Sequence, residues 1–147
     1  MIFISPDKQI SATIHSGAVY LINLKNKGYD SETSHLYVVI NKTPLVDYRI
    51  IMCWITTETD IHRTAMCNRN LAARFIRLTK DTYDELSRPS VVDCHNYEAR
   101  TLEEIISKYK EGKLRIKKPL HVDIVNSIRS KLVDSATLDE KIRKILD

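Results

Sequence analysis

Residues 49–57 read Arg49-Ile50-Ile51-Met52-Cys53-Trp54-Ile55-Thr56-Thr57, an apolar run that ends in two adjacent hydroxyl side chains. The run is rich in β-branched and aromatic residues and contains no Gly or Pro, which favours a strand that is buried on most of its surface. The two threonines then lie at a strand end, where rigid folds commonly present functional groups. Hydroxyls at such a position either take part in chemistry or satisfy the backbone of the following turn.

Four further segments have the composition of strands, and the first three strands follow one another without helices between them. These four segments are residues 17–24, 34–40, 75–78 and 90–94. Helical patterns come later. A capping box at Thr101 begins one helix, Gly112 ends it, and apolar stripes run through residues 122–133 and 138–146. Strands followed by helices, without β-α-β alternation, indicate an α+β protein built on an antiparallel sheet.

A chain of 147 residues is long enough for one hydrophobic core and short for two domains. No apolar run approaches the roughly 18 residues that cross a bilayer, and the first residues lack a secretion signal, so we expect a cytoplasmic protein. Cys53, Cys67 and Cys94 are odd in number and include no short-spaced pair, which argues against a disulfide framework and a zinc site. We expect neither a metal nor another cofactor.

The net charge of +4 is spread unevenly along the chain. Residues 1–100 carry 12 Lys/Arg against 11 Asp/Glu, whereas residues 101–147 carry 11 against 8. Most of the excess lies in residues 108–118, where six basic side chains face only Glu111. This stretch either neutralises phosphates or forms an ordinary solvated face.

Two polar segments are predicted to be surface loops. The first, Lys25 to Thr33, is long for a hairpin and carries Gly28 as its turn residue. The second, Glu58 to Arg74, follows the Thr-Thr pair and contains three arginines. In a dimer, these two loops are expected to line a basic groove for a phosphate backbone.

The order of these motifs resembles the MazF/PemK (Kid-like) toxin family over about residues 16–106. In that family a Gly-led first strand precedes a long loop and a second strand. A third strand ends in Thr or Ser, and a late strand carries an acidic or other polar group. The resemblance implies an SH3-like small antiparallel β-barrel with C-terminal helices. We therefore divide the chain into a barrel domain, residues 1–111, and a helical extension packed on it, residues 112–147.

The resemblance also implies a function, namely cleavage of single-stranded RNA without a metal by a homodimer that an antitoxin protein restrains. The 2′-hydroxyl attacks the neighbouring phosphate, which requires a proton acceptor, a proton donor and groups that hold the developing charge. One departure bears on this activity. Many family members have an Arg-Pro pair before the apolar run of the second strand, whereas this chain has His35-Leu36. An imidazole can transfer a proton near neutrality but cannot supply the bidentate fork of a guanidinium.

The sequence thus yields candidate residues for two roles. The catalytic candidates are His35, Thr56, Thr57, Asp93 and Arg100. The RNA-binding candidates are Lys25, Lys27, Arg49, Arg63, Arg69, Lys117 and Lys118. The missing Arg-Pro pair leaves an alternative open, in which the chain is a catalytically inactive module that binds nucleic acid or protein. In that case His35 and Asp93 are merely hydrogen-bonded strand residues.

Overall fold

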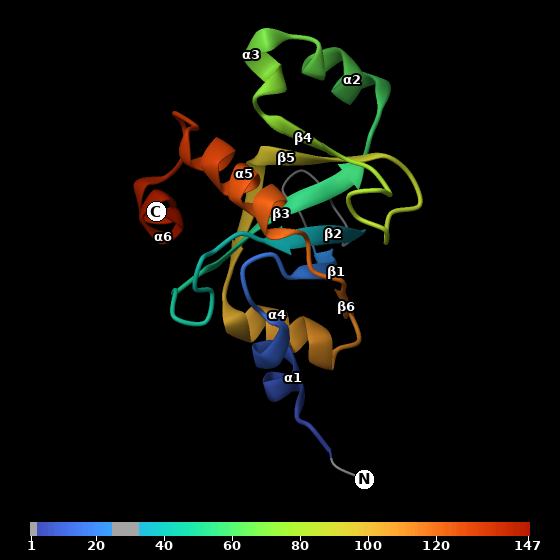
Figure 1. The fold of residues 1–147 in the computed structure, drawn as a ribbon. Helices are drawn as coiled ribbons and strands as arrows, with labels where there is room; N and C mark the ends of the chain where they lie inside the picture. Colours follow the sequence, from blue (N-terminus) through green and yellow to red (C-terminus); the bar gives the residue numbers. More distant parts are fainter. Residues whose placement is uncertain (1–2, 25–32) are drawn as a thin grey trace.

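A computed structural model describes residues 3–24 and 33–147 of the chain, and Figure 1 shows the fold. The strands and helices alternate irregularly along the sequence. In chain order they are α1 (Pro6–Thr13), β1 (Val19–Leu24), β2 (Thr33–Val39), β3 (Ile50–Thr57), α2 (Asp60–Met66), α3 (Arg69–Ala72), β4 (Phe75–Leu78), β5 (Ser90–Arg100), α4 (Leu102–Lys110), β6 (Leu114–Lys117), α5 (Val122–Val133) and α6 (Glu140–Leu146).

The strands form one six-stranded sheet in the order β4-β5-β3-β2-β1-β6, and every neighbouring pair is antiparallel. Strand β3 lies inside the sheet between β2 and β5. Its first four residues, 50–53, have no exposed surface. The predictions of an α+β protein and of a buried central strand that ends in the threonine pair are therefore confirmed.

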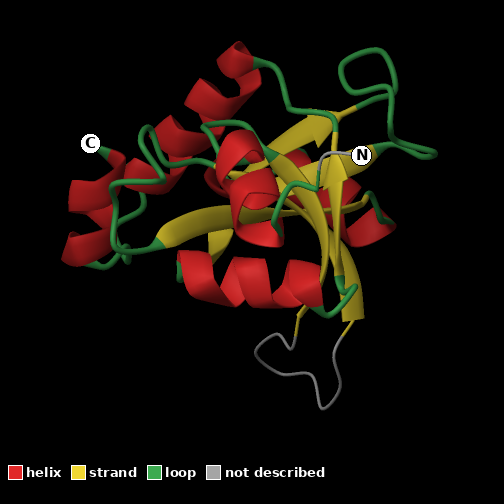
Figure 2. Ribbon diagram, turned by 90° about the horizontal axis from the view of Figure 1, so that it is seen from below, coloured by secondary structure: helices red, strands yellow, loops and turns green. Residues whose placement is uncertain are grey.

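Helices cover both faces of the sheet (Figure 2). Alternate strand residues such as Tyr20, Tyr37 and Met52 pack with α1 and α4, and we call this side the α4 face. The residues between them, for example Val38 and Cys53, pack with α5 and α6 on the opposite side, the α5 face. This division follows from the two-residue period of a strand, which sends successive side chains to opposite faces.

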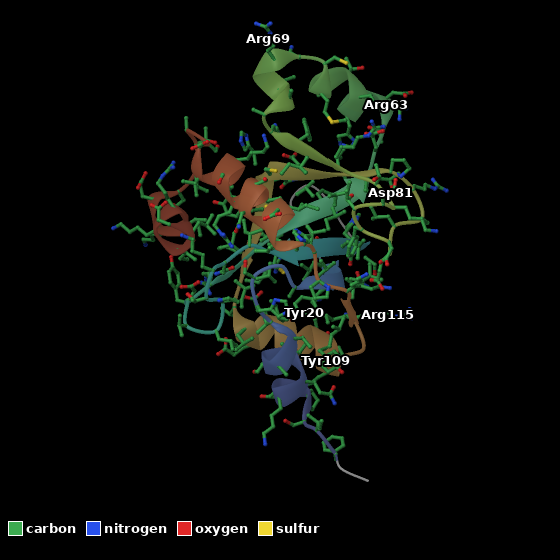
Figure 3. All side chains as sticks on the ribbon, viewed as in Figure 1. Tyr20, Arg63, Arg69, Asp81, Tyr109 and Arg115 are labelled. Atoms are coloured by element: carbon green, nitrogen blue, oxygen red, sulfur yellow. The ribbon has the colours of Figure 1, made fainter. Side chains whose placement is uncertain are left out.

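Helices α1 and α4 lie together at the bottom of Figure 1, and Figure 3 shows Tyr20 and Tyr109 where they meet the sheet. The hydroxyl of Tyr109 on α4 donates a hydrogen bond to the Gln9 side chain on α1. The Tyr20 hydroxyl lies 2.9 Å from that of Thr13, and burial raises the pKa of Tyr20 to about 12. Helices α1 and α4 therefore cover part of the α4 face.

The segment from Glu58 to Arg74 was expected to be a loop, but it contains α2 and α3, beyond β4 at the top of Figure 1. Thr59 caps α2 through a capping box in which His62 occupies the N3 position. The sequence signature of this box has Glu or Gln at that position. Because His62 takes the place of that residue and α2 has no buried residue, neither a cap signal nor an apolar period marked the helix.

Two other elements lacked a periodic signal in the sequence. Helix α1 buries only Ile10, so it shows no apolar stripe. Strand β6 pairs with β1 and lies within residues 108–118, where the sequence shows an excess of basic side chains but no strand pattern. This strand belongs to the sheet although residues 112–147 were expected to be helical, and the boundary at residue 111 stays a prediction.

The sheet has two edge strands, β4 and β6, and the pairings among the described residues do not join them. Closure into an SH3-like barrel therefore stays a prediction. Within residues 3–24 and 33–147, no helix is long and apolar enough to cross a membrane. The expected loop that begins at Lys25, together with the candidate Lys27, falls on residues 25–32 and so lies outside the described residues.

Candidate functional site

The α4 face continues beyond α1 and α4 into a polar region that these helices leave open. Strand alternation places Trp54 and Thr56 of β3 on this face, next to His35 of β2. The His35 ring meets the indole of Trp54 edge-on, with centroids 4.5 Å apart and planes at 80°. His35, Trp54 and Thr56 are each half-buried. Two of the catalytic candidates, His35 and Thr56, are therefore brought together.

A hollow of about 330 Å³ opens where β1, β2 and β3 end, and we call it the strand-end hollow. Residues of three strands and of the segment before β5 line it, including His35, Thr56, Thr57, Arg88 and Ser90. Its apolar lining residues Leu36, Ile55 and Leu86 belong to the core of the α5 face. Thr57 follows Thr56 along the strand, so its side chain points to the α5 face, and it pairs with Ser90. The two threonines thus share a strand end but serve opposite faces.

Arg88 was not a candidate from the sequence, yet it lines the strand-end hollow with His35 and Thr56. Strand β5 runs antiparallel to β3, and the Glu58 N–H donates to the Pro89 carbonyl at 3.0 Å, which brings the residues before β5 to the threonine end. Arg88 is exposed and forms no ion pair among the described residues. A signal did exist, since Arg88-Pro89 precedes an apolar run, but that run belongs to β5 rather than β2.

Burial lowers the pKa of His35 from its ordinary value of 6.5. The side chain is therefore neutral at pH 7, with an imidazole nitrogen able to accept a proton. The side chains of His35 and Thr56 thus project from the strand ends on the α4 face, and Arg88 lies in the segment that borders the same strand ends. A proton acceptor and two donors for an anionic oxygen are the groups that phosphodiester chemistry uses.

Arg100, a catalytic candidate, does not reach this hollow. It pairs with Ile50, six residues before Thr56 on β3, which corresponds to roughly 20 Å along the strand. Its guanidinium donates to Glu98 at 3.2 Å and to Glu104 at 3.3 Å. The expectation that Arg100 joins His35 and Thr56 is wrong, because β5 carries it to the opposite end of β3.

Asp93, the remaining catalytic candidate, lies opposite Trp54 on the α4 face. Arg74 holds its carboxylate through two hydrogen bonds of 2.7 Å, and the backbone N–H of His95 donates to it at 3.2 Å. This bidentate pair orients the carboxylate and occupies both of its oxygens. Asp93 therefore fixes the local course of β5.

The RNA-binding candidates that the structure describes do not form one groove. Arg63 pairs with Glu58 and Asp60, and Lys118 pairs with Asp84 at 2.9 Å. Arg69 projects from α3 at the top of Figure 3, beyond one sheet edge, whereas β6, with Lys117, is the other edge.

Arg49 lies beside the ring of Tyr48, with its guanidinium carbon 5.9 Å from the ring centre. It directly precedes β3, at the end of that strand where Ile50 pairs with Arg100 of β5. Phosphate binding by these side chains stays a prediction. The described residues contain no group of three or more His, Cys, Asp or Glu side chains that could hold a metal ion.

Comparison with known proteins identifies a fold but no sequence family. No family model and no curated protein sequence matches the chain. Among solved structures, it is similar to a chain of the MazE–MazF complex of Deinococcus radiodurans in two crystal forms. Form III is 12% identical with a TM-score of 0.50, form II is 14% identical with a TM-score of 0.51, and both matches cover 82% of this chain and 92% of that one.

A third similar structure is an endoribonuclease in complex with its cognate antitoxin from a mycobacterial species. It is 14% identical with a TM-score of 0.51, and the match covers 86% of this chain and 97% of that one. Identities this low establish the shared fold. The MazF-like fold that the order of motifs implied is thereby confirmed.

Proposed function

We propose that this chain is a toxin-like endoribonuclease that cleaves single-stranded RNA without a metal ion. The observation that carries the proposal is the shared end of β2 and β3, where the neutral imidazole of His35 and the hydroxyl of Thr56 project on the α4 face and Arg88, which has no ion pair among the described residues, borders the same strand ends. Arg88 supplies the fork that the Arg-Pro pair of the second strand would have supplied. Its place beside the strand ends supports the proposal although the Arg-Pro pair is missing from the second strand.

The proposed reaction begins when His35 accepts the proton of the ribose 2′-hydroxyl. The 2′ oxygen forms a bond to phosphorus and the bond from phosphorus to the 5′ oxygen breaks, leaving a 2′,3′-cyclic phosphate. The leaving 5′ oxygen takes a proton from water, and the resulting hydroxide takes the proton held by His35. Arg88 and Thr56 donate hydrogen bonds to the non-bridging oxygens as negative charge develops there.

The proposal includes an antitoxin partner and a homodimer. Two of the similar structures are MazE–MazF complexes and the third is an endoribonuclease with its cognate antitoxin. These similarities support a protein partner of the same kind for this chain. Co-purification of the chain with the product of an adjacent gene, and its mass in solution, would test both points.

A second candidate function is a binding module without catalysis, and one observation favours it. Several arginines around the open part of the α4 face are already held by carboxylates: Arg74 by Asp93, and both Arg63 and Arg77 by Glu58. The Glu58 side chain is 1% exposed, so its two ion pairs are partly desolvated. A surface neutralised in this way attracts a phosphate backbone weakly.

The decisive experiment measures RNA cleavage by purified protein with divalent ions chelated. We expect cleavage, and we expect His35→Ala to slow it at least about tenfold, equivalent to about 1.4 kcal/mol of barrier. His15→Ala is the matched control, because His15 is exposed and lies outside the strand-end hollow. Intact RNA after prolonged incubation with native protein would refute the enzyme, and equal rates for the two variants would remove His35 from the mechanism.

A further inference from the structure

Strand β5 contains a bulge that no catalytic role has so far explained. Cys53 pairs with Tyr97 while the next residue, Trp54, pairs with Asp93, so residues 94–96 have no partner on β3. Extra residues of this kind bend a strand and redirect its side chains. The bulge therefore aims His95 and Asn96 away from the regular ladder, and both side chains are exposed.

Specific hydrogen bonds hold the bulge in place. The backbone N–H of Cys94 donates to the Arg74 carbonyl at 2.8 Å, and that of His95 donates to the Asp93 carboxylate at 3.2 Å. The Arg74 guanidinium in turn grips Asp93 with two hydrogen bonds. The displaced residues are thus fixed by backbone and side-chain contacts at once, as expected of a preformed binding site.

Beside the bulge lies a hollow of about 450 Å³, which we call the bulge pocket. The half-buried indole of Trp54 lines it together with His95, Asn96 and Glu98, and Tyr37, which is 1% exposed, adjoins it from the neighbouring strand. The pocket therefore combines flat aromatic surface with an imidazole, an amide and a carboxylate. This combination suits a planar heterocycle whose faces stack and whose edge makes hydrogen bonds.

The edge groups are open to a ligand. Within the part of the chain that the structure describes, the Asn96 side chain makes no hydrogen bond, so its amide can offer one donor and one acceptor. Glu98 receives Arg100 Nη2 on its Oε2 atom at 3.2 Å, which leaves Oε1 to accept from a ligand. Arg100 thus acts here as a positioning residue for Glu98.

We propose that the bulge pocket binds one nucleobase of the RNA strand and favours bases that carry an exocyclic amino group. A carboxylate accepts from such an amino group, and an amide pairs with the adjacent donor and acceptor edge of adenine. Uracil presents two carbonyls and no amino group, so it leaves Glu98 without this partner. This inference rests on the proposed function, because it takes RNA as the ligand.

The position of the bulge pocket relative to His35 supports the assignment. Trp54 lines the bulge pocket, and the centroid of its ring lies 4.5 Å from that of the His35 ring. A base stacked over Trp54 therefore lies next to the proposed proton acceptor. The pocket would then select the nucleotide beside the scissile phosphate.

The experiment uses the fluorescence of Trp54, which is the single tryptophan of the chain and lines the bulge pocket. The probes are short 2′-O-methyl oligonucleotides of adenine, cytosine or uracil, which cannot be cleaved because the nucleophile is blocked. We expect the adenine and cytosine probes to quench Trp54 at concentrations about fivefold or more below the uracil probe. Equal quenching by all three probes would overturn the base preference.

Three variants of the full chain test the assignment of the edge groups. Asn96→Ala should weaken the adenine probe by about fivefold or more, and Glu98→Gln should reduce the preference over uracil by a similar factor. Glu103→Gln is the control, since Glu103 is an exposed residue of α4 outside the bulge pocket. Unfolding curves like those of the native chain would show that each variant is folded. Unchanged probe affinities in folded Asn96→Ala and Glu98→Gln would overturn the assignment.

RNA cleavage and quenching of Trp54 fluorescence test the nuclease and the base site separately. RNA cleavage without any fluorescence response to the probes would leave the nuclease intact and overturn the bulge pocket as a base site. Selective quenching without cleavage of an unmodified RNA would support the base site and refute the nuclease.

Discussion

Each end of strand β3 lies beside an arginine. Arg88, which precedes β5, lies at one end, and Arg100, the last residue of β5, lies at the other, yet their surroundings differ. At the end with Thr57, Arg88 lines an open hollow and has no ion pair among the described residues. At the end with Ile50, Arg100 lies near α4 and pairs with Glu98 and Glu104. Of these two arginines, only Arg88 can take a phosphate without giving up a carboxylate partner among the described residues.

This difference explains why a count of basic residues says little about RNA binding in this chain. A guanidinium that carboxylates already hold gives up charge-assisted hydrogen bonds before it binds a phosphate. Arg63, Arg74, Arg77 and Arg100 are all held in this way. An available guanidinium at the threonine end of β3, rather than charge alone, therefore marks Arg88 as the phosphate ligand of the proposed reaction.

The strongest test of the comparison removes each arginine in turn. Arg88→Ala should slow RNA cleavage by about 100-fold, equivalent to about 2.7 kcal/mol, because it removes a charged donor that acts on the developing negative charge. Arg100→Ala should keep the rate on a mixed-sequence RNA within about threefold, since its guanidinium lies far from the scissile phosphate. Single-turnover cleavage of a labelled RNA measures both. A larger loss in Arg100→Ala than in Arg88→Ala would reverse the comparison.

A second prediction concerns the pH dependence of cleavage at the threonine end. Burial lowers the pKa of His35, so the proton acceptor stays neutral as the pH falls through 6.5 and is lost only at lower pH. The acidic limb of the rate profile should therefore lie below pH 6.5. His35→Gln should slow cleavage at least about tenfold and abolish this limb. A limb at or above pH 6.5 would contradict the role of a desolvated imidazole.

The same shift predicts a modest effect of pH on stability. The pKa of His35 is lower in the folded chain, so the unfolded chain binds this proton more readily. The contribution of His35 to stability is complete above about pH 6.5 and is lost as the pH falls toward the folded pKa. The unfolding free energy of the native chain should fall more steeply than that of His35→Gln over this range. Denaturant titrations at several pH values measure the difference.

A smaller effect separates the two adjacent threonines. Thr56→Ala should slow cleavage about fivefold, the loss of one neutral hydrogen bond, because its side chain shares the α4 face with His35. Thr57→Ala should leave the rate unchanged, since its side chain points to the opposite face. Equal losses in the two variants would show that strand alternation does not control access to the phosphate.

The smallest predicted effect is on stability at the Ile50 end. Arg100→Ala should lower the unfolding free energy by less than about 1 kcal/mol, because partly exposed ion pairs contribute little. The side chains of Arg100 and Glu104 are 25% and 48% exposed. Denaturant unfolding of the variant measures this change. A loss of several kcal/mol would show that the pairs at this end are structural.

Several elements were predictable from local chemistry alone. The capping box of Thr101 and Glu104 begins α4 as expected, and the apolar stripe of residues 122–133 is α5. Helix α1 and helix α2 were missed because each buries too little apolar surface to show a period. Local signals thus identified the elements with a sustained apolar pattern, and failed for those that contribute few core residues, such as Ile10 of α1 and Leu114 of β6.

The sequence by itself determined that β3 is buried and ends in two hydroxyls, because composition and the absence of Gly and Pro are local properties. Only the tertiary structure decided which arginine reaches those hydroxyls. Strand β5 pairs antiparallel to β3, so its first residue, Ser90, meets Thr57 and its last, Arg100, meets Ile50. The direction of pairing depends on contacts between residues that are distant in the sequence. It places Arg88, and not Arg100, at the candidate site.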